Sequence, residues 1–261
     1  METVSYVSII GMCFALLISV GLPVALMIYA HIKLKADIIW CIIGAVTFII
    51  FAMLLEQVLH SFVLKSYGDV LNSNVFLLAI YGGIAAGLFE ELGRFVSMKL
   101  FQKKLLKKQN AFMYGVGHGG CEAILIVGLT SISNIITSFM INSGAYESIL
   151  SGLEPQLKEQ TLQQVSLLWK TDSIAFYLGG IERIIAITLH ICLSYIVYRA
   201  VTEHKAQFLL LSIAIHALID IITVVMSKNN MLILTEIVLI FLVTLLAIAV
   251  IRDSKGREVC N

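Results

Sequence analysis

Several segments that are apolar enough to cross a membrane carry acidic, basic and histidine side chains in their interior. These ionisable side chains lie in four separate apolar segments and are Glu90, Glu91, Arg94, His118, Glu122, His190, His216 and Asp220. An ionisable side chain in the hydrocarbon region is costly unless it faces a partner or a water-filled cavity. The set therefore indicates an intramembrane site that either catalyses a reaction or moves ions.

The spacing of these residues pairs them on helix faces. Side chains three or four residues apart lie on the same face of a helix. Glu90 and Glu91 precede Arg94 by four and three residues, so the arginine can neutralise one glutamate and leave the other free to act. Later pairs with helical spacing are His118/Glu122, His216/Asp220 and, seven residues apart, Arg183/His190.

The composition predicts an all-α, polytopic membrane helix bundle. Of the 261 residues, 59% are hydrophobic and only 13% are charged, whereas soluble domains are about a quarter charged. A helix needs roughly 20 apolar residues to cross a bilayer. We expect seven spans in a single domain of residues 1–261, at about 4–30, 36–64, 74–98, 111–141, 172–198, 206–226 and 231–251.

The positions of lysine and arginine predict that the N-terminus is outside and the C-terminus inside. In that orientation 12 of the 18 basic residues lie on the inner side. They fall in the connections 31–35, 99–110 and 199–205 and in the C-terminal tail. The basic segment around Lys103 and Lys104 is expected to anchor this topology, and the chain is expected in the plasma membrane as a multi-pass protein.

The depth of the polar residues supports a shared site. Counted from the inner end of each span at about 1.5 Å per residue, Glu90, His118, His190 and His216 all fall roughly 10–15 Å below the inner boundary. Glycines surround this layer at Gly82, Gly83 and Gly87 and at Gly115, Gly117, Gly119 and Gly120, and small residues let helices approach closely. Glu56 and His60 lie near the outer end of the second span and are interpreted as a separate structural pair.

Three kinds of chemistry fit this layer. A carboxylate beside histidines can deprotonate a water that attacks a carbonyl, while further donors stabilise the oxyanion. If a metal binds, His118, His190 and His216 could form a zinc site assembled from separate helices, although the sequence lacks the HExxH motif. The same network could instead relay protons or ions in a transporter.

Two further features are interpreted as structural. The five cysteines (Cys13, Cys41, Cys121, Cys192 and Cys260) show no CxxC pattern and are expected to be unpaired and inert. The connection 142–171 is polar and is expected outside. Its stretch from Pro155 to Trp169 has near-helical spacing of apolar residues, which predicts a short amphipathic helix on the outer membrane surface.

Three motifs within residues 75–225 resemble those of a known superfamily. The run Glu90-Glu91-Leu-Gly-Arg94 resembles the EExxxR/EExxK motif of the CAAX prenyl protease (Abi) and PrsW groups. Tyr114 to His118 is similar to FxxxH, and His216 to Asp220 is similar to HxxxN/D. The order of EExxR, HGGxE and HxxxD most resembles the YhfC family. The first motif is one residue shorter than EExxxR, Tyr114 replaces Phe, and Asp220 replaces the common Asn.

The resemblance implies a glutamic-type intramembrane endopeptidase. Carried over to this chain, Glu90 or Glu91 would activate water together with His118, and His216 with Asp220 would form the oxyanion site. Arg94 would support the first motif. Glu122 and His190, which lie outside the three motifs shared with the superfamily, would support the site. We therefore expect a peptidase without a cofactor, with zinc as the alternative. Its partners would be membrane lipids and a membrane-associated protein substrate, and not nucleic acid.

Overall fold

The computed structural model describes residues 2–105 and 107–259, with the side chains of 103–105 and 257–259 excepted. The side chains of the predicted inner anchors Lys103, Lys104 and Arg257 therefore lie outside the described part, as does the whole of Cys260. Every regular element within it is a helix, as predicted. The other four cysteines are free thiols.

Seven helices are long and apolar enough to cross a membrane, which confirms the predicted number. They are Tyr6–Ile32, Ile39–Ser73, Val75–Gln102, Lys108–Asn142, Ser173–Thr202, Ala206–Lys228 and Leu232–Gly256. The second extends nine residues beyond the predicted 36–64, because α3 continues as a polar helical extension in which no residue is buried. The chain is a multi-pass membrane protein.

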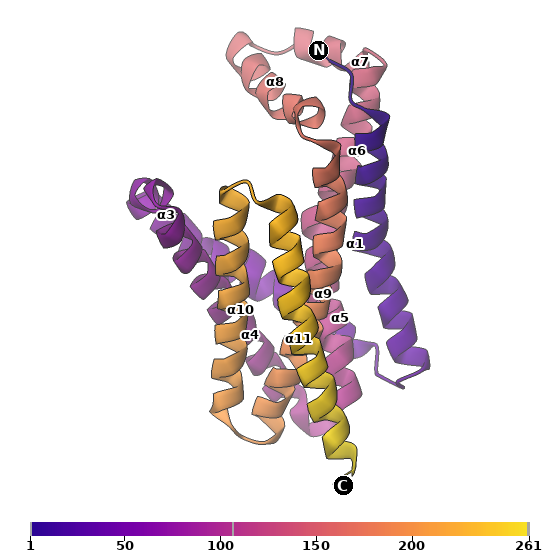
Figure 1. The fold of residues 1–261 in the computed structure, drawn as a ribbon, viewed down its shortest axis with the longest axis vertical. Helices are drawn as coiled ribbons and strands as arrows, with labels where there is room; N and C mark the ends of the chain where they lie inside the picture. The colour runs from indigo at the N-terminus through magenta and orange to yellow at the C-terminus, as the bar shows by residue number, and fades with distance from the viewer. Residues whose placement is uncertain (1, 106, 260–261) are drawn as a thin grey trace. The chain divides into compact units, whose positions relative to one another are not determined.

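The elements follow one another as helices with short connections. They are α1 (Tyr6–Ile32), α2 (Ile39–Phe48), the π-helix η1 (Ile49–Glu56), α3 (Gln57–Ser73), α4 (Val75–Leu105), α5 (Lys108–Ala123), the π-helix η2 (Ile124–Gly128), α6 (Leu129–Asn142), α7 (Ala145–Ser151), α8 (Pro155–Lys170), α9 (Ser173–Thr202), α10 (Ala206–Lys228) and α11 (Leu232–Val259). The predicted helix at 155–169 is α8, whereas α7 was not predicted. Figure 1 labels these elements along the chain.

The backbone divides into two compact units. Unit 1 comprises Met1–Leu22 and Ala123–Ile184, and unit 2 comprises Pro23–Glu122 and Ile185–Asn261. A single domain was the expectation from the sequence. All eight residues of the predicted polar layer belong to unit 2, so one compact unit contains the whole candidate site.

Unit 1 has an apolar core under α8. Leu168 of α8 is buried with Val4, Met12 and Ile141, and Trp169 packs against them. The N-terminal segment is tied to α6 by two hydrogen bonds, in which Val4 N donates to Asn142 Oδ1 at 2.7 Å and Asn142 Nδ2 donates to Val4 O at 2.9 Å. The buried face of α8 therefore packs on protein.

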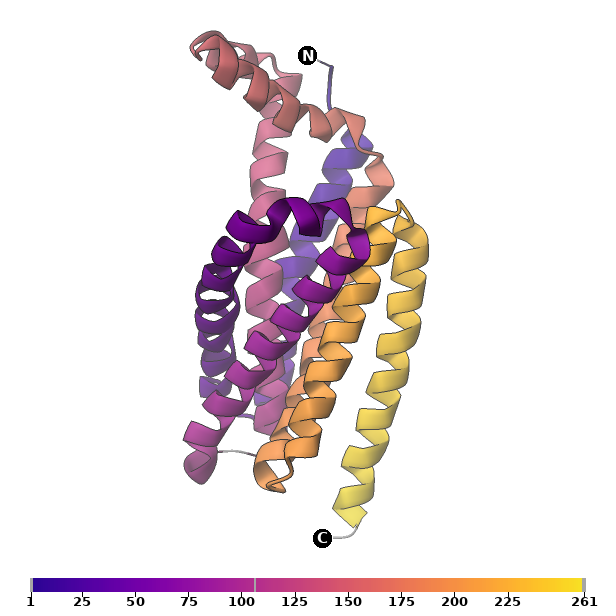
Figure 2. The ribbon, with the colours of Figure 1, turned by 90° about the vertical axis from the view of Figure 1, so that its left-hand side faces the viewer.

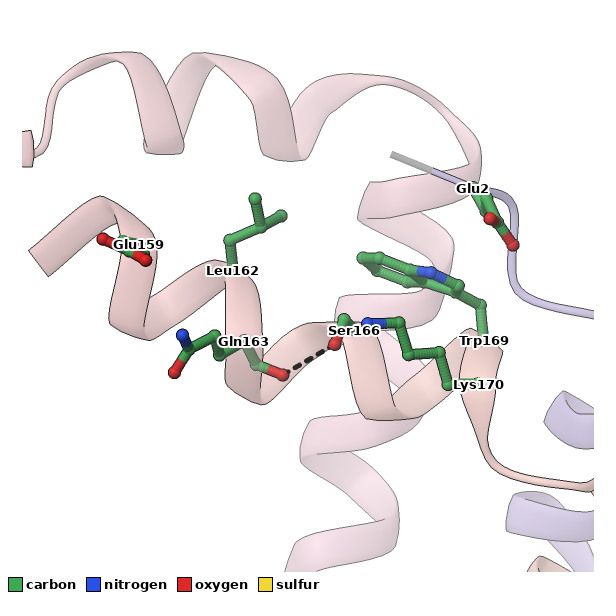
Figure 3. A pocket seen from close by; sticks show the side chains of 7 residues that line it. All are labelled: Glu2, Glu159, Leu162, Gln163, Ser166, Trp169 and Lys170. Carbon is green, nitrogen blue, oxygen red and sulfur yellow. Dashed lines mark hydrogen bonds between the residues drawn. The ribbon is translucent and has the colours of Figure 1, made fainter.

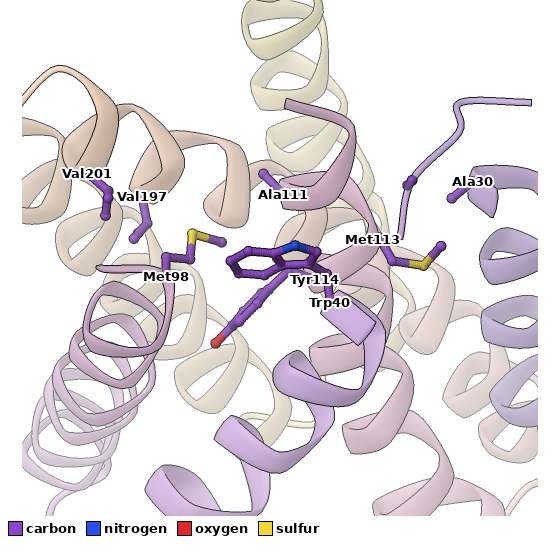
Figure 4. Packing of buried hydrophobic residues seen from close by; sticks show 9 residues of the cluster. Ala30, Trp40, Met98, Ala111, Met113, Tyr114, Val197 and Val201 are labelled. Carbon is purple, nitrogen blue, oxygen red and sulfur yellow. The ribbon is translucent and has the colours of Figure 1, made fainter. Parts of the chain in front are cut away.

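Unit 2 is held at one end by a fully buried aromatic pair. Trp40 of α2 and Tyr114 of α5 lie with ring centroids 6.4 Å apart, and Met98 of α4 and Val197 of α9 belong to the same cluster (Figure 4). Helices α4 and α10 pack against each other and lie side by side in Figure 2, and α11 follows α10 after a short turn (Figure 1). This packing fixes α4, α5, α9 and α10, the four helices that carry the polar residues.

Candidate functional site

The predicted polar residues converge on one buried cluster. Glu90 Oε2 lies 2.8 Å from His118 Nε2, although 28 residues separate the two in the sequence. The imidazole rings of His118 and His190 have centroids 4.9 Å apart, and those of His190 and His216 are 5.3 Å apart. Four helices thus bring one glutamate and three histidines into contact, as their shared depth predicted.

Glycines on α4 allow α10 to approach closely enough to make these contacts. A Cβ atom on Gly83 would lie 2.6 Å from the carbonyl oxygen of Ala217, and one on Gly87 would lie 2.9 Å from that of Ile213. A real Cβ cannot occupy either position, so the two backbones touch through these glycines. Because Gly87 lies one turn before Glu91, the crossing places the first motif directly against α10.

Glycines on α5 serve the same purpose on three sides. Gly115 and Gly119 face α9, where added Cβ atoms would lie 2.6 Å from Ile191 Cα and 3.1 Å from His190 Cβ. Gly117 faces α2, and a Cβ there would overlap the carbonyl group of Cys41. Gly120 faces Pro23, with a Cβ 2.7 Å from the proline ring. His118 is therefore fixed by backbone contacts on several sides.

The two adjacent glutamates have different surroundings. Glu90 contacts His118 and lies 4.0 Å from His190 Nδ1, and 9% of its side chain is exposed. Glu91 is fully buried and receives donors at both oxygens: His216 Nδ1 at 2.9 Å and Arg94 Nη2 at 3.4 Å near Oε1, and Ser212 Oγ at Oε2. The arginine therefore neutralises Glu91 and leaves Glu90 facing the histidines.

Arg94 also fixes His190. Its Nη1 donates to the His190 carbonyl oxygen at 2.9 Å and to Ser194 Oγ at 3.1 Å, and its Nη2 lies 3.1 Å from His190 Nδ1. A guanidinium group can only donate, so Nδ1 accepts and the ring proton lies on Nε2. That nitrogen lies 2.6 Å from Glu122 Oε2. His190 is thus held between a cation and a carboxylate.

The side chains of the cluster differ in how much of them is exposed. Asp220, one turn beyond His216 on α10, lies 3.6 Å from His216 Nε2 and has 33% of its side chain exposed. Glu122, one turn beyond His118 on α5, is 14% exposed. Glu91 and Arg94, by contrast, have no exposed surface. The more accessible groups are the carboxylates that follow the histidines, and Arg94 is among the least accessible.

Glu56 and His60 form a second polar cluster, with Tyr81. His60 Nε2 lies 3.1 Å from Glu56 Oε1, and its Nδ1 lies 2.7 Å from the Tyr81 hydroxyl oxygen. The π-helix η1 ends at the buried Glu56. The interpretation of Glu56 and His60 as a separate structural pair stays a prediction.

Arg183 and a pocket along α8 belong to unit 1, whereas the histidine cluster belongs to unit 2. Arg183, the predicted helical partner of His190, donates to Glu182 Oε1 at 2.6 Å. Unit 1 has a wide, shallow pocket of about 630 Å³ along α8 (Figure 3). It is lined by Glu2, Glu159, Leu162, Gln163, Ser166, Trp169 and Lys170, and none of these is a histidine or a cysteine.

Three donor atoms of the cluster fit a metal ion. One ligand atom each of Glu90, His190 and His216 lies within 4.8 Å of the other two, and all three residues are buried. The other nitrogen of each histidine faces a carboxylate, Glu122 for His190 and Glu91 for His216, an arrangement that orients zinc ligands. An ion at His190 Nδ1 would replace its contact with Arg94. One carboxylate with two imidazoles is a ligand set of catalytic zinc.

This set differs in one member from the three histidines proposed from the sequence. His118 Nε2 is engaged by Glu90, and its Nδ1 has no hydrogen-bond partner within the described part of the chain. Glu90 therefore takes the place of His118 among the candidate ligands, and His118 orients Glu90.

Two serines in the cluster were not identified from the sequence. Ser212 contacts Glu91, and Ser194 accepts from Arg94 while donating to the His190 carbonyl oxygen at 2.7 Å. Both lie four residues from a histidine of the layer, Ser212 before His216 and Ser194 after His190. The i,i+4 rule used for the charged pairs would have found them if hydroxyl groups had been included.

Comparison with known proteins identifies the family. Residues 16–243 match the family model described as YhfC intramembrane metalloprotease. The chain belongs to the YhfC family. It is 40% identical over 210 residues to the uncharacterized membrane protein YhfC of Bacillus subtilis (strain 168), covering 80% of this chain and 81% of that relative. No solved structure matches.

Membership of the YhfC family confirms the family predicted from the three motifs and supports an intramembrane protease. The family name does not support the expectation of a peptidase without a cofactor, because it specifies a metalloprotease. The buried group of Glu90, His190 and His216 is where the donor atoms of this chain fit such a metal.

Proposed function

We propose that this YhfC family member hydrolyses a peptide bond of a membrane-embedded or membrane-associated protein within the bilayer. The observation that carries the proposal is the contact of Glu90 with His118 beside His190 and His216, all buried in membrane-length helices. Peptide hydrolysis requires a proton acceptor near water and a group that stabilises charge on the substrate oxygen. The cluster supplies both kinds of group.

Glu90, His190 and His216 would hold a zinc ion. Zinc bound there would act as a Lewis acid on the substrate carbonyl group. Glu122 and Glu91 orient the two histidines, and His118 orients the Glu90 carboxylate through the 2.8 Å contact at Oε2. That contact is also where the chain can hold a proton and pass it between Glu90 and His118.

The second candidate mechanism activates water without a metal, and the direct Glu90–His118 contact favours it. Glu90 would take the proton from water with His118 as its partner, and His216, oriented by Glu91, would stabilise the oxyanion. In both mechanisms Glu90 faces the substrate. Glu91 does not, because its oxygens are occupied by Arg94, Ser212 and His216.

Metal content separates the two mechanisms. Purified protein is measured for zinc by elemental analysis and for cleavage before and after chelation. About one zinc per chain, with cleavage that chelation abolishes and zinc restores, supports the zinc mechanism. Full cleavage by metal-free protein would replace it with water activation by Glu90 and His118.

Cleavage itself is tested in membranes from cells that produce the wild-type chain or Glu90→Gln. New protein N-termini are identified by mass spectrometry, and we expect termini that occur only with the wild type. Identical termini in both samples would overturn the peptidase proposal. Glu90-dependent proton uptake into vesicles, without such termini, would instead favour a transporter that uses the same residues.

A further inference from the structure

Ser212 uses its hydroxyl group differently from its neighbours. Serine and threonine side chains in helices commonly donate to the carbonyl oxygen of the preceding turn. Ser194 does so to His190 at 2.7 Å and Thr223 does so to Ile219 at 2.8 Å. Ser212, which is fully buried, donates instead across to Glu91 on α4, 121 residues away in the sequence.

The contact completes the surroundings of Glu91. With Ser212 at Oε2 and with His216 and Arg94 near Oε1, the carboxylate is fixed in one orientation. An ionised carboxylate only accepts, so Nδ1 of His216 must carry a proton. Its Nε2 then points away from Glu91, toward the side where Asp220 lies at 3.6 Å.

We propose that Ser212 and Glu91 are positioning residues that fix the rotamer and the tautomer of His216 for metal binding at Nε2. This inference rests on the proposed function, in which His216 is a zinc ligand. In this inference Glu91 orients His216 and does not transfer a proton to or from water. Ser212 acts indirectly, by holding the Glu91 carboxylate in place. Groups that orient a histidine ligand typically change metal affinity about 10–100-fold when removed.

The test compares zinc affinity in Ser212→Ala and in the matched control Thr223→Val, which removes a hydroxyl from the same helix. Detergent-purified proteins compete for zinc with a chromophoric chelator, and the absorption spectrum of bound cobalt reports the ligand geometry. We expect roughly 10–100-fold weaker zinc binding and a shifted cobalt spectrum in Ser212→Ala, with both readouts unchanged in Thr223→Val.

Unchanged zinc affinity and cobalt spectrum in Ser212→Ala would overturn this inference while leaving the proposed zinc site intact. Wild-type protein that binds no zinc would overturn both. If Ser212→Ala does not fold, Ser212→Cys decides, because the thiol is a weaker donor of similar size. A loss of affinity in that variant supports the role of Ser212, and unchanged affinity contradicts it.

Discussion

Two regions of unit 2 each hold a glutamate against a histidine, and they differ in what surrounds the pair. Around Glu90, side chains from α4, α5, α9 and α10 meet, and the buried Arg94 donates to the His190 carbonyl oxygen. Around Glu56, the partner His60 comes from the next turn of the same continuous helical segment, and Tyr81 of α4 contacts His60. Both glutamates are buried.

The difference shows that a buried carboxylate–histidine contact does not by itself identify a site. In the Glu56 cluster both nitrogens of His60 are used in contacts within the cluster. In the Glu90 cluster, ligand atoms of three residues from three helices face one another. Several helices must pack closely and bury charged groups to bring these side chains together. The resulting group of donor atoms makes the Glu90 cluster the one suited to catalysis.

Removing each carboxylate charge in turn should separate the two clusters most clearly. Glu90→Gln is expected to lower cleavage of the substrates found in membranes by about 10²–10⁴-fold, because glutamine neither accepts a proton nor replaces a charged ligand. Glu56→Gln should leave cleavage near the wild-type level, because Glu56 is not among the candidate metal ligands. Product formation is measured by quantitative mass spectrometry. Equal losses in the two variants would mean that the clusters act as one site.

Arg94→Ala should have the largest effect on stability. It leaves Glu91 as a buried charge without its cation, which typically costs about 3–5 kcal/mol. Thermal unfolding in detergent is the measurement. Lys99→Ala is the matched control on the same helix, since Lys99 is exposed and lies over the Phe95 ring. A wild-type melting temperature for Arg94→Ala would contradict the buried ion pair with Glu91.

Two glycines test how closely the helix backbones pack. Gly117→Ala should cost about 1–3 kcal/mol, because the new methyl group would overlap the Cys41 carbonyl group. Gly82→Ala meets nothing within 4 Å and should be neutral or stabilising by up to about 1 kcal/mol, since alanine favours the helix. Unfolding temperatures of both variants are compared, and equal values would contradict the close contact of α5 with α2.

The smallest expected effect is that of Tyr81→Phe. It removes one hydroxyl group at 2.7 Å from His60 and should cost about 0.5–1.5 kcal/mol in unfolding free energy. Cleavage should remain at the wild-type level, because the Tyr81 hydroxyl contacts His60, which is not among the candidate metal ligands. A cleavage loss above about tenfold would instead place Tyr81 and His60 in the functional site.

The sequence determined much of the architecture because membrane insertion depends on local composition. Runs of apolar residues long enough to cross a bilayer identify seven spans whatever their packing, and α8 followed from the spacing of its apolar residues. The similar depth of Glu90 and the three histidines within their spans followed from the span boundaries and the helix rise. The inside position of the C-terminus stays a prediction from the positions of lysine and arginine.

Tertiary structure decided which residue does what. Helical spacing allowed Arg94 to pair with either glutamate, and only the packing of α10 against Gly83 and Gly87 brings Ser212 and His216 to Glu91. His118 likewise meets Glu90 through contacts between helices, whereas the three residues whose donor atoms lie close together are Glu90, His190 and His216. Depth places a side chain along the membrane normal, but its rotation toward a particular neighbour depends on which backbones can touch, and that is a property of the folded bundle.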